Sequence, residues 1–280
     1  MNKEKPIKIG VIGGTGFENP TIFKKKRTIA VITKFGKPSS KLILSKIGDK
    51  DIVFLSRHNI GHSIIPSLVP NLANIAALKK LGCTHIIATT ACGSLREKIK
   101  PGDFVFVDQF IDRTTKRQST FFEKGHVLHV PMAEPFCPNL RKILAETAKK
   151  LKYRFHPKGT VVTIEGPRFS SKAESLMFQK WAGDVINMST VPEVVLAREA
   201  GLHYAVIAMS TDYDCWHKTE KSVDASIIYE IMKKNVDKVE KLILEVIPKI
   251  KNYNVKDDIS HTRYDTCDCQ SEISKIQMDS

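Results

Sequence analysis

A chain of 280 residues, 42% of them apolar, can bury one sizeable core, either as a single α/β domain or as two small ones. No apolar run approaches the ~20 residues of a membrane-spanning helix, and the start of the chain lacks the form of a signal peptide. The net charge of +14 raises the question of nucleic acid, but the basic residues are scattered and no nucleic-acid-binding motif accompanies them. We therefore expect neither nucleic acid nor a membrane as partner, and a cytoplasmic protein with the nucleus as a further compartment.

Strand-like apolar runs alternate with helical patterns along the chain. The pattern predicts strands at 7–12, 29–33, 42–47, 52–56, 85–90, 104–108, 159–164, 185–187 and 204–209. It predicts helices at 71–81, 139–151, 172–181, 191–200 and 222–247. This alternation is typical of the α/β class, with a mixed β-sheet flanked by helices in one domain over residues 7–250. Residues 251–280 are polar and lack periodicity, which predicts a loosely ordered tail.

The six cysteines are expected to be reduced thiols, because a chain of this length needs no disulfide to be stable. Cys267 and Cys269 form a C-x-C pair in the polar tail, without the second ligand pair that a zinc site requires. Cys92 follows a predicted strand, but no His–Asn arrangement of a thiol enzyme accompanies it. We therefore expect Cys92 to be a buried structural residue.

Glycine, hydroxyl and charged side chains follow several predicted strands, at the position where α/β sheets bind ligands. The glycines of Gly13-Gly14-Thr15-Gly16 let backbone N–H groups approach an anion, although their spacing fits neither a dinucleotide fingerprint nor a P-loop. Arg57, His58 and the hydroxyl of Thr90 are further donors that suit phosphate. Taken singly, a tight turn and a surface ion pair are the plainer explanations of the first two segments.

Two carboxylates, Asp212 and Asp214, lie just past the predicted strand at 204–209. Such a pair can be a general acid with its helper, part of a metal site or a solvated turn. The metal interpretation lacks the further acidic ligands that Ca²⁺ or Mg²⁺ needs.

Together and in order, these segments resemble the trimeric purine nucleoside phosphorylases, and in particular the S-methyl-5'-thioadenosine phosphorylases. The matching segments, within about residues 7 to 248, are Ile9–Gly16, Arg57-His58, Thr89–Leu95, Gly102-Asp103, Asp108–Thr114, Glu165–Phe169, Asn187–Glu193 and Thr211–Trp216. The resemblance implies a single-domain purine nucleoside phosphorylase-like fold and a homotrimer with active sites close to subunit interfaces. It implies a glycosyl-transfer reaction of purine and methionine salvage, the phosphorolysis of 5'-methylthioadenosine to adenine and 5-methylthioribose 1-phosphate.

The resemblance also implies a role for each matching residue. The phosphate-binding positions are Thr15, Arg57, His58, Thr90, Ala91 and Ser189. The nucleoside-binding positions are Phe169, Asn187, Met188, Thr211, Asp212 and Asp214, with His62, Val223 and Ile227 near the 5' group. Asp212 is the implied catalytic acid, which neutralises the leaving purine at N7. Phosphate is a co-substrate, and neither a metal nor an organic cofactor is implied.

Three positions depart from the family pattern. Asn59 stands where Gly is usual, Ser189 stands where Thr is frequent, and Pro70-Asn71-Leu72 stands where Asn-Tyr and a polar residue are common.

Two other functions compete with the phosphorolysis of methylthioadenosine. A phosphorylase of 6-oxopurines such as inosine or guanosine would use an Asn near Asp212, because a 6-oxo group needs a donor whereas a carboxylate accepts from a 6-amino group. A catalytically silent nucleoside-binding protein on the same fold is the second rival. The presence of the phosphate-binding residues and of both carboxylates argues against it.

Overall fold

The computed structural model describes residues 6–24, 26–122, 128–217 and 225–251, with only the backbone of residues 225–229. Its strands are β1 (Lys8–Gly13), β2 (Arg27–Ile29), β3 (Leu42–Ile47), β4 (Lys50–Ser56), β5 (His85–Ser94), β6 (Phe104–Phe106), β7 (Gln109–Arg113), β8 (Phe155–His156), β9 (Thr160–Ile164), β10 (Val185–Asn187) and β11 (His203–Tyr213). Its helices are α1 (Asn71–Lys80), α2 (Pro138–Lys150), α3 (Lys172–Lys180), α4 (Thr190–Glu199) and α5 (Ala225–Val246), with the short 3₁₀ helices η1 (Pro66–Leu68) and η2 (Ile247–Lys249).

The strands of the described residues form one mixed sheet, and β5 lies at its centre. The main path runs β2-β3-β4-β1-β5-β10-β9-β7, while β11 pairs with β5 and β6. β5 runs parallel to β1 and β11, but its last two residues, Gly93 and Ser94, pair antiparallel with β10. The sheet therefore changes direction beside the end of β5, and the carboxyl ends of β1, β4, β5 and β11 meet near this point.

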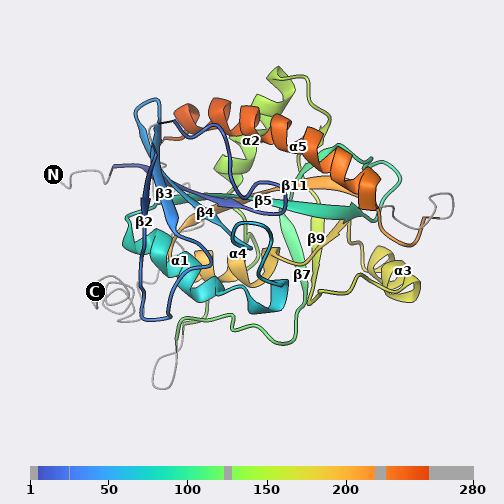
Figure 1. Cartoon of the computed structure of the whole chain (residues 1–280). Coiled ribbons are helices and arrows are strands. Elements are labelled where there is room, and N and C mark those ends of the chain that lie inside the picture. The colour runs from blue at the N-terminus through green and yellow to red at the C-terminus, as the bar shows by residue number, and fades with distance from the viewer. Residues whose placement is uncertain (1–5, 25, 123–127, 218–224, 252–280) are drawn as a thin grey trace.

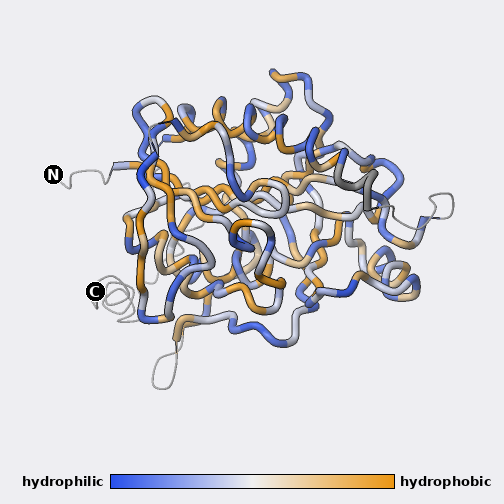
Figure 2. Tube along the Cα trace, in the orientation of Figure 1, coloured by the Kyte–Doolittle hydropathy of each residue, from blue (hydrophilic) through white to orange (hydrophobic). Residues whose placement is uncertain are grey.

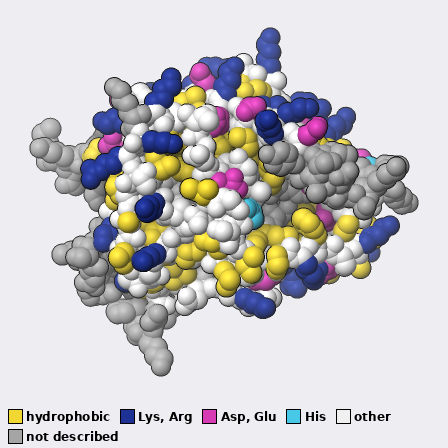
Figure 3. Space-filling model, viewed as in Figure 1, with side chains coloured by type: hydrophobic (Ala, Val, Ile, Leu, Met, Phe, Trp, Pro, Cys, Tyr) yellow, Lys and Arg dark blue, Asp and Glu magenta, His cyan; other side chains and the backbone are white. Residues whose placement is uncertain are grey.

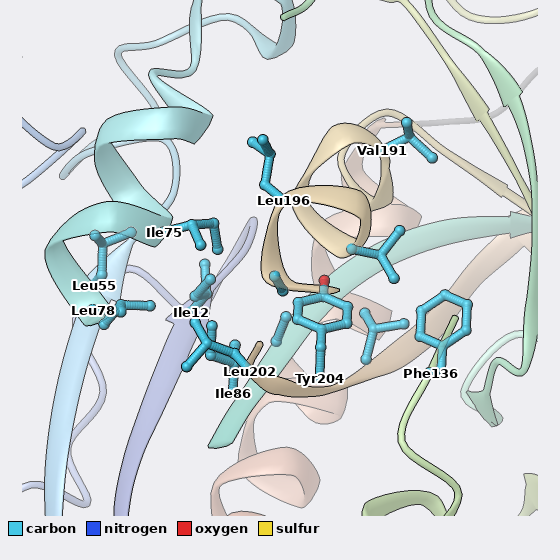
Figure 4. Packing of buried hydrophobic residues seen from close by; sticks show 14 of the residues in the cluster. Ile12, Leu55, Ile75, Leu78, Ile86, Phe136, Val191, Leu196, Leu202 and Tyr204 are labelled. Carbon is cyan, nitrogen blue, oxygen red and sulfur yellow. The ribbon is translucent and has the colours of Figure 1, made fainter. Parts of the chain in front are cut away.

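Helices cover both faces of the sheet, with α2 and α5 on one side and α1 and α4 on the other (Figure 1). Successive residues of β11 point to opposite faces. Ala205, Ile207 and Met209 pack in the cluster with α2 and α5, while Val206 and Ala208 pack with α1 and α4. Because both faces are buried, the central strands are mostly apolar along the tube in Figure 2. Figure 4 shows the second cluster at close range, where side chains of α1 and α4 meet those of the central strands.

The structure confirms the α/β class and a mixed sheet flanked by helices. β3 and β10 have the predicted bounds. The predicted strand at 29–33 is wrong: β2 ends at Ile29, and the chain then bends through a turn in which Thr33 and Gly36 exchange backbone hydrogen bonds. β11 extends to Tyr213, four residues beyond its predicted end at 209, so Asp212 lies within the strand and not past it.

Several predictions concern residues that the structure does not describe, and they remain predictions. Residues 252–280 and 218–224 lie outside the described residues, and with them the predicted tail, the C-x-C pair and the predicted start of the last helix at Ser222. The described helices include none with the length and hydropathy of a membrane-spanning segment. Lys and Arg side chains are scattered among apolar and acidic ones over the face in Figure 3.

Candidate active site

A cavity of about 410 Å³ lies where the carboxyl ends of β1, β4, β5, β10 and β11 meet. Most predicted site residues line it: Thr15, His58, His62, Thr90, Ala91, Phe169, Asn187, Met188, Ser189, Thr211, Asp212 and Asp214. Residues that sequence reasoning did not assign complete the wall: Ile65, Pro66, Cys92, Gly93, Ile164, Pro167, Ser170, Ile186 and Met232. Segments far apart in the chain thus form one pocket, as the rule for strand ends predicts.

Three predicted residues are not among those that line the described cavity. Arg57 lies behind the wall, with 1% of its surface exposed. Val223 lies outside the described residues, and Ile227 belongs to the part of α5 whose side chains are not described. Met232, one turn and a little further along α5, does line the cavity, so this helix reaches it.

Hydroxyl groups from β5 and from the end of β10 form one wall of the cavity. Thr90 Oγ1 and Ser189 Oγ lie 2.8 Å apart, within hydrogen-bond distance. Asn187 braces this pair: its Nδ2 donates to Thr90 Oγ1 at 3.2 Å, and its Oδ1 accepts from Thr163 Oγ1 at 3.0 Å. The antiparallel pairing of β10 with the end of β5 brings these side chains together. The result is a fixed pair of hydroxyls that can turn their protons toward an anion.

The turn after β1 packs tightly against this wall. Gly14 N–H donates to Thr89 Oγ1 at 2.9 Å. A Cβ at Gly14 would lie 2.4 Å from the Thr89 carbonyl oxygen and 2.7 Å from Arg57 Nη1, so a larger residue does not fit. The glycine thus allows the close approach that places Thr15 and Thr90 on the same cavity.

Arg57 is held by a buried ion pair with Glu193 on α4. Its Nε and Nη2 donate to the two Glu193 carboxylate oxygens at 2.8 Å each, and its Nη1 donates to the Thr89 carbonyl at 2.8 Å. Tyr204 OH donates to Glu193 Oε1 at 2.7 Å. Burial alone would lower the pKa of Arg57, but the charge and hydrogen bonds of Glu193 hold it above its ordinary value. A guanidinium carries five N–H donors, so these three bonds leave two that have no hydrogen-bond partner among the described residues.

The imidazole of His58 is buried against the same end of the cavity. Its Nδ1 lies 2.8 Å from the Ile64 carbonyl oxygen, and the His62 ring stacks on it at 4.3 Å between centroids. Burial and the positive charge of Arg57 lower the pKa of His58 to about 4. At neutral pH this ring is therefore uncharged.

The two carboxylates lie at the carboxyl end of β11, beside Gly93. Thr211 Oγ1 donates to Asp212 Oδ2 at 2.6 Å, and a Cβ at Gly93 would lie 3.1 Å from Asp212 Oδ1. Burial raises the pKa of Asp214, which favours retention of a proton within the pair. Among the residues that the structure describes, no three His, Cys, Asp or Glu side chains are grouped as metal ligands.

Cys92 confirms its predicted place in the interior. It is 3% exposed, and burial, with a contribution from the charge of Asp212, raises its pKa well above the ordinary value. Its thiol is therefore neutral and unreactive. Cys83, Cys137 and Cys215 are free thiols as well, as predicted.

Comparison with known proteins identifies the family. The model of the phosphorylase superfamily matches residues 8–248. S-methyl-5'-thioadenosine phosphorylase of Danio rerio is 54% identical over 255 residues, covering 89% of this chain and 91% of the relative. The protein of that name from Aedes aegypti is 55% identical, covering 87% of this chain and 89% of its own. The chain belongs to the S-methyl-5'-thioadenosine phosphorylases.

Solved structures of S-methyl-5'-thioadenosine phosphorylases have the same fold as this chain. Methylthioadenosine phosphorylase of Schistosoma mansoni in complex with adenine is 42% identical, with a TM-score of 0.86 and 98% of each chain covered. A mutant of the adenosine/methylthioadenosine phosphorylase of the same organism, in complex with methylthioadenosine, gives a TM-score of 0.85 at 42% identity, again with 98% of each chain covered. These matches confirm the resemblance and the fold that the sequence motifs implied.

Two charged residues of this chain were missed by sequence reasoning. Glu193 lies inside a segment that carried the resemblance, so its place in the motif was visible although its contact with Arg57 was not. Arg117 lies in an irregular segment and donates to the carbonyls of Met188, Val191 and Glu165 at 2.7–2.8 Å. Nothing in the pattern around Arg117 indicates that it fixes the backbone of the cavity wall.

Proposed function

We propose that this chain cleaves 5'-methylthioadenosine with inorganic phosphate and releases adenine and 5-methylthioribose 1-phosphate. The observation that carries the proposal is one cavity with hydroxyl donors and His58 at one side and the Asp212–Asp214 pair at another. Relatives that share about half of this chain's residues bear the name of that activity, and a solved relative holds methylthioadenosine. The same family membership places the reaction in purine and methionine salvage.

The phosphate side of the site is proposed to consist of Thr15, Thr90, Ser189, the backbone of Ala91 and His58. Hydroxyl and N–H donors at fixed positions bind phosphate beneath the sugar, where its negative charge stabilises the cation that develops during bond cleavage. Arg57 retains its proposed part through its two unused donors and through the backbone of Thr89, which it holds in place.

The purine side of the site is proposed to consist of Asp212 and Asp214. Cleavage of the glycosidic bond leaves negative charge on the purine, and a proton supplied at N7 by Asp212 neutralises it. The raised pKa of Asp214 keeps a proton available to the pair at higher pH than two ordinary carboxylates would. The carboxylates also accept from the 6-amino group, which favours adenine over the 6-oxopurines of the rival function.

The ribose and 5' side is proposed to lie between Met188, Asn187 and Phe169, with Thr211 near the base. Phe169 is 75% exposed at the cavity mouth, so its ring is available to cover a bound nucleoside. His62, Val223 and Ile227 are proposed for the 5' group. Met232 supports the part given to α5, because it brings an apolar side chain of that helix to the cavity.

The assembly and location of the chain are further proposals. We propose a homotrimer, on the basis of the family resemblance and of apolar side chains exposed beside the cavity, among them Ile60 (72%) and Leu68 (70%). Sedimentation velocity of the purified chain tests this state directly. A cytoplasmic location, with the nucleus as a second compartment, is proposed from the free thiols of the interior.

The experiment that tests the function is an assay of adenine release from methylthioadenosine. We expect release that depends on inorganic phosphate, continues in the presence of a chelator, and greatly exceeds hypoxanthine release from inosine. Release without phosphate, or loss of activity with the chelator, contradicts the proposed chemistry. Inosine cleavage at an equal kcat/KM supports the rival function, and no turnover of either nucleoside supports a silent binding protein.

A further inference from the structure

The positive charges around the phosphate side of the cavity are already paired with glutamates. Arg57 forms its bidentate ion pair with Glu193, and Arg117 Nε lies 3.3 Å from Glu165 Oε1. The described residues that line the cavity include no Lys or Arg, whereas two carboxylates do line it. A phosphate dianion would therefore enter a pocket whose fixed cations are compensated, and burial of an uncompensated anion is unfavourable.

The hydrogen bond at Nδ1 fixes the tautomer of His58. A carbonyl oxygen can only accept, so the 2.8 Å contact with Ile64 O places a proton on Nδ1. In the neutral ring, Nε2 is then an acceptor and has no proton to donate to an anion. Among the residues that the structure describes, Nε2 has no hydrogen-bond partner. The ring can bind a phosphate oxygen only if a proton lies between the two atoms.

The charged groups around His58 keep the ring neutral. Arg57 on its own segment and Arg117 from the segment after β7 both oppose a further positive charge. His62 stacks on the ring, and its own Nδ1 lies 3.7 Å from Glu18 Oε1 of the turn after β1. Together with burial, these groups lower the pKa of His58 to about 4. A bound anion would offset the two arginines and favour the protonated ring.

We propose that phosphate binds to this chain together with one proton, which is shared between a phosphate oxygen and Nε2 of His58. The inference rests on the proposed function, since it concerns the co-substrate of that reaction. The complex can be written as dihydrogen phosphate beside neutral His58 or as hydrogen phosphate beside protonated His58. Both forms contain one proton more than hydrogen phosphate and neutral His58 do when separate, so both count as one bound proton. The proton removes one negative charge from the buried complex and provides the hydrogen bond that Nε2 lacks.

Isothermal titration calorimetry of the full chain with inorganic phosphate tests this proposal. At mildly alkaline pH, where hydrogen phosphate predominates, titrations in buffers of different ionisation enthalpy give the number of protons taken up. We expect about one proton per phosphate, and an affinity that falls about tenfold for each pH unit of further increase. Sulfate, which carries no proton in this range, should show the same uptake. Binding of both anions without proton uptake would overturn the proposal.

Two glutamine variants identify the group that shares the proton. His58→Gln should bind phosphate with no proton uptake and without the tenfold decline, whereas His156→Gln, the same change at a histidine of β8 that does not line the cavity, should keep both. Uptake that persists in His58→Gln would overturn the assignment. If His58→Gln does not fold, the sulfate titration of the unmodified chain still decides. Phosphate-dependent adenine release with no proton uptake refutes this inference alone, whereas absence of phosphate binding and of release refutes the proposed function as well.

Discussion

At the scale of single residues, small polar groups determine what this site can hold. Asn59 has a φ of 60°, in the left-handed region where glycine is unstrained and Asn is the best tolerated of the other residues. The family preference for glycine at this position thus has a backbone cause, and Asn satisfies it. Ser189 keeps the hydroxyl that Thr supplies in relatives and bonds with Thr90 through it. These two departures therefore leave the proposed phosphate side intact.

Asp212 carries the first residue-scale prediction. Asp212→Asn keeps the size of the side chain but removes the proton that the proposed acid delivers to N7. We expect kcat/KM with methylthioadenosine to fall ~10²–10⁴-fold. Inosine should become relatively less disfavoured, because the amide can donate to its 6-oxo group.

The matched control for Asp212→Asn is Asp51→Asn, the same chemical change at a half-exposed carboxylate of β4 paired with Lys46. Its kinetics should equal those of the parent. If Asp212→Asn retains kcat/KM within about threefold of the parent, well short of the general-acid expectation, Asp212 is not the catalytic acid.

Glu193 carries the second residue-scale prediction. Glu193→Gln keeps the shape but leaves Arg57 as a buried charge without its counterion, which should lower the free energy of unfolding by about 3–5 kcal/mol. Because Arg57 then loses its orientation, the KM for phosphate should rise more than the KM for the nucleoside.

Urea denaturation and steady-state kinetics measure these two effects of Glu193→Gln. Asp51→Asn is again the control, since loss of an exposed ion pair costs only about 0–1 kcal/mol. Equal increases in both KM values would show that Glu193 has a purely structural role.

At the scale of elements, strong patterns were predictable and edges were not. β3 was predicted correctly because apolar residues recur along it between clear turns. β7 was missed because this edge strand is largely exposed and carries polar residues, and β8 was missed because it has only two residues. These weak strands owe their existence to their partners in the sheet, which sequence periodicity does not reveal.

In the candidate site as well, residues at strand ends could be predicted from the sequence, whereas contacts between distant elements could not. The rule for strand ends located Thr15, Thr90 and the carboxylates of β11, since it needs only the order of the strands. It did not indicate that Arg57 pairs with Glu193 behind the cavity wall, because that contact between the end of β4 and α4 forms only in the folded chain. The same holds for the carbonyl contacts of Arg117.

Helix α5 carries the prediction at this scale. Met232 brings an apolar wall to the cavity, so a methylthio group at the 5' position should be preferred over a hydroxyl. One small apolar group contributes ~1–3 kcal/mol, so adenosine should be a substrate with a kcat/KM ~10–200-fold lower. The adenosine/methylthioadenosine phosphorylase of Schistosoma mansoni is named for both nucleosides.

A polar substitution on α5 tests whether that helix contributes to this preference. Met232→Gln has a similar length and should shrink the ratio of the two kcat/KM values. Leu244→Gln, the same kind of change at a residue of the same helix that is 37% exposed, should leave the ratio unchanged. Both kcat/KM values are measured on the same protein preparation. Partial unfolding therefore lowers both values equally and does not change their ratio. Equal ratios in the parent and Met232→Gln would remove Met232 from the 5' pocket.

At the scale of the whole molecule, burial on both faces of the sheet also encloses titratable groups. His58 and His85 are 4% and 2% exposed. Burial and the charge of Arg57 lower the pKa of His58 to about 4, and burial with the neighbouring His203 lowers that of His85 to about 3. Both rings lie on strands or strand ends of the central sheet, so the fold as a whole determines their ionisation.

The stability of the chain should therefore fall on acidification. An unfolded histidine takes up a proton near pH 6.5, whereas folded His58 resists it down to about 4 and folded His85 to about 3. Between these limits the unfolded state binds more protons, so each histidine lowers the free energy of unfolding by about 1.4 kcal/mol per pH unit of decrease. Glu165 and Glu174, whose hydrogen bonds lower their pKa values to about 2, act in the same direction as the histidines, whereas Asp214, whose pKa burial raises, acts in the opposite direction. Urea denaturation of the parent and of His58→Gln from pH 7 to pH 4 isolates the contribution of His58. The difference in the free energy of unfolding between the two proteins should shrink by about 1.4 kcal/mol for each pH unit below 6.5. Parallel curves for the two proteins would mean that His58 is protonated equally in both states, and that the hydrogen bond to Ile64 and the burial of the ring do not control its charge.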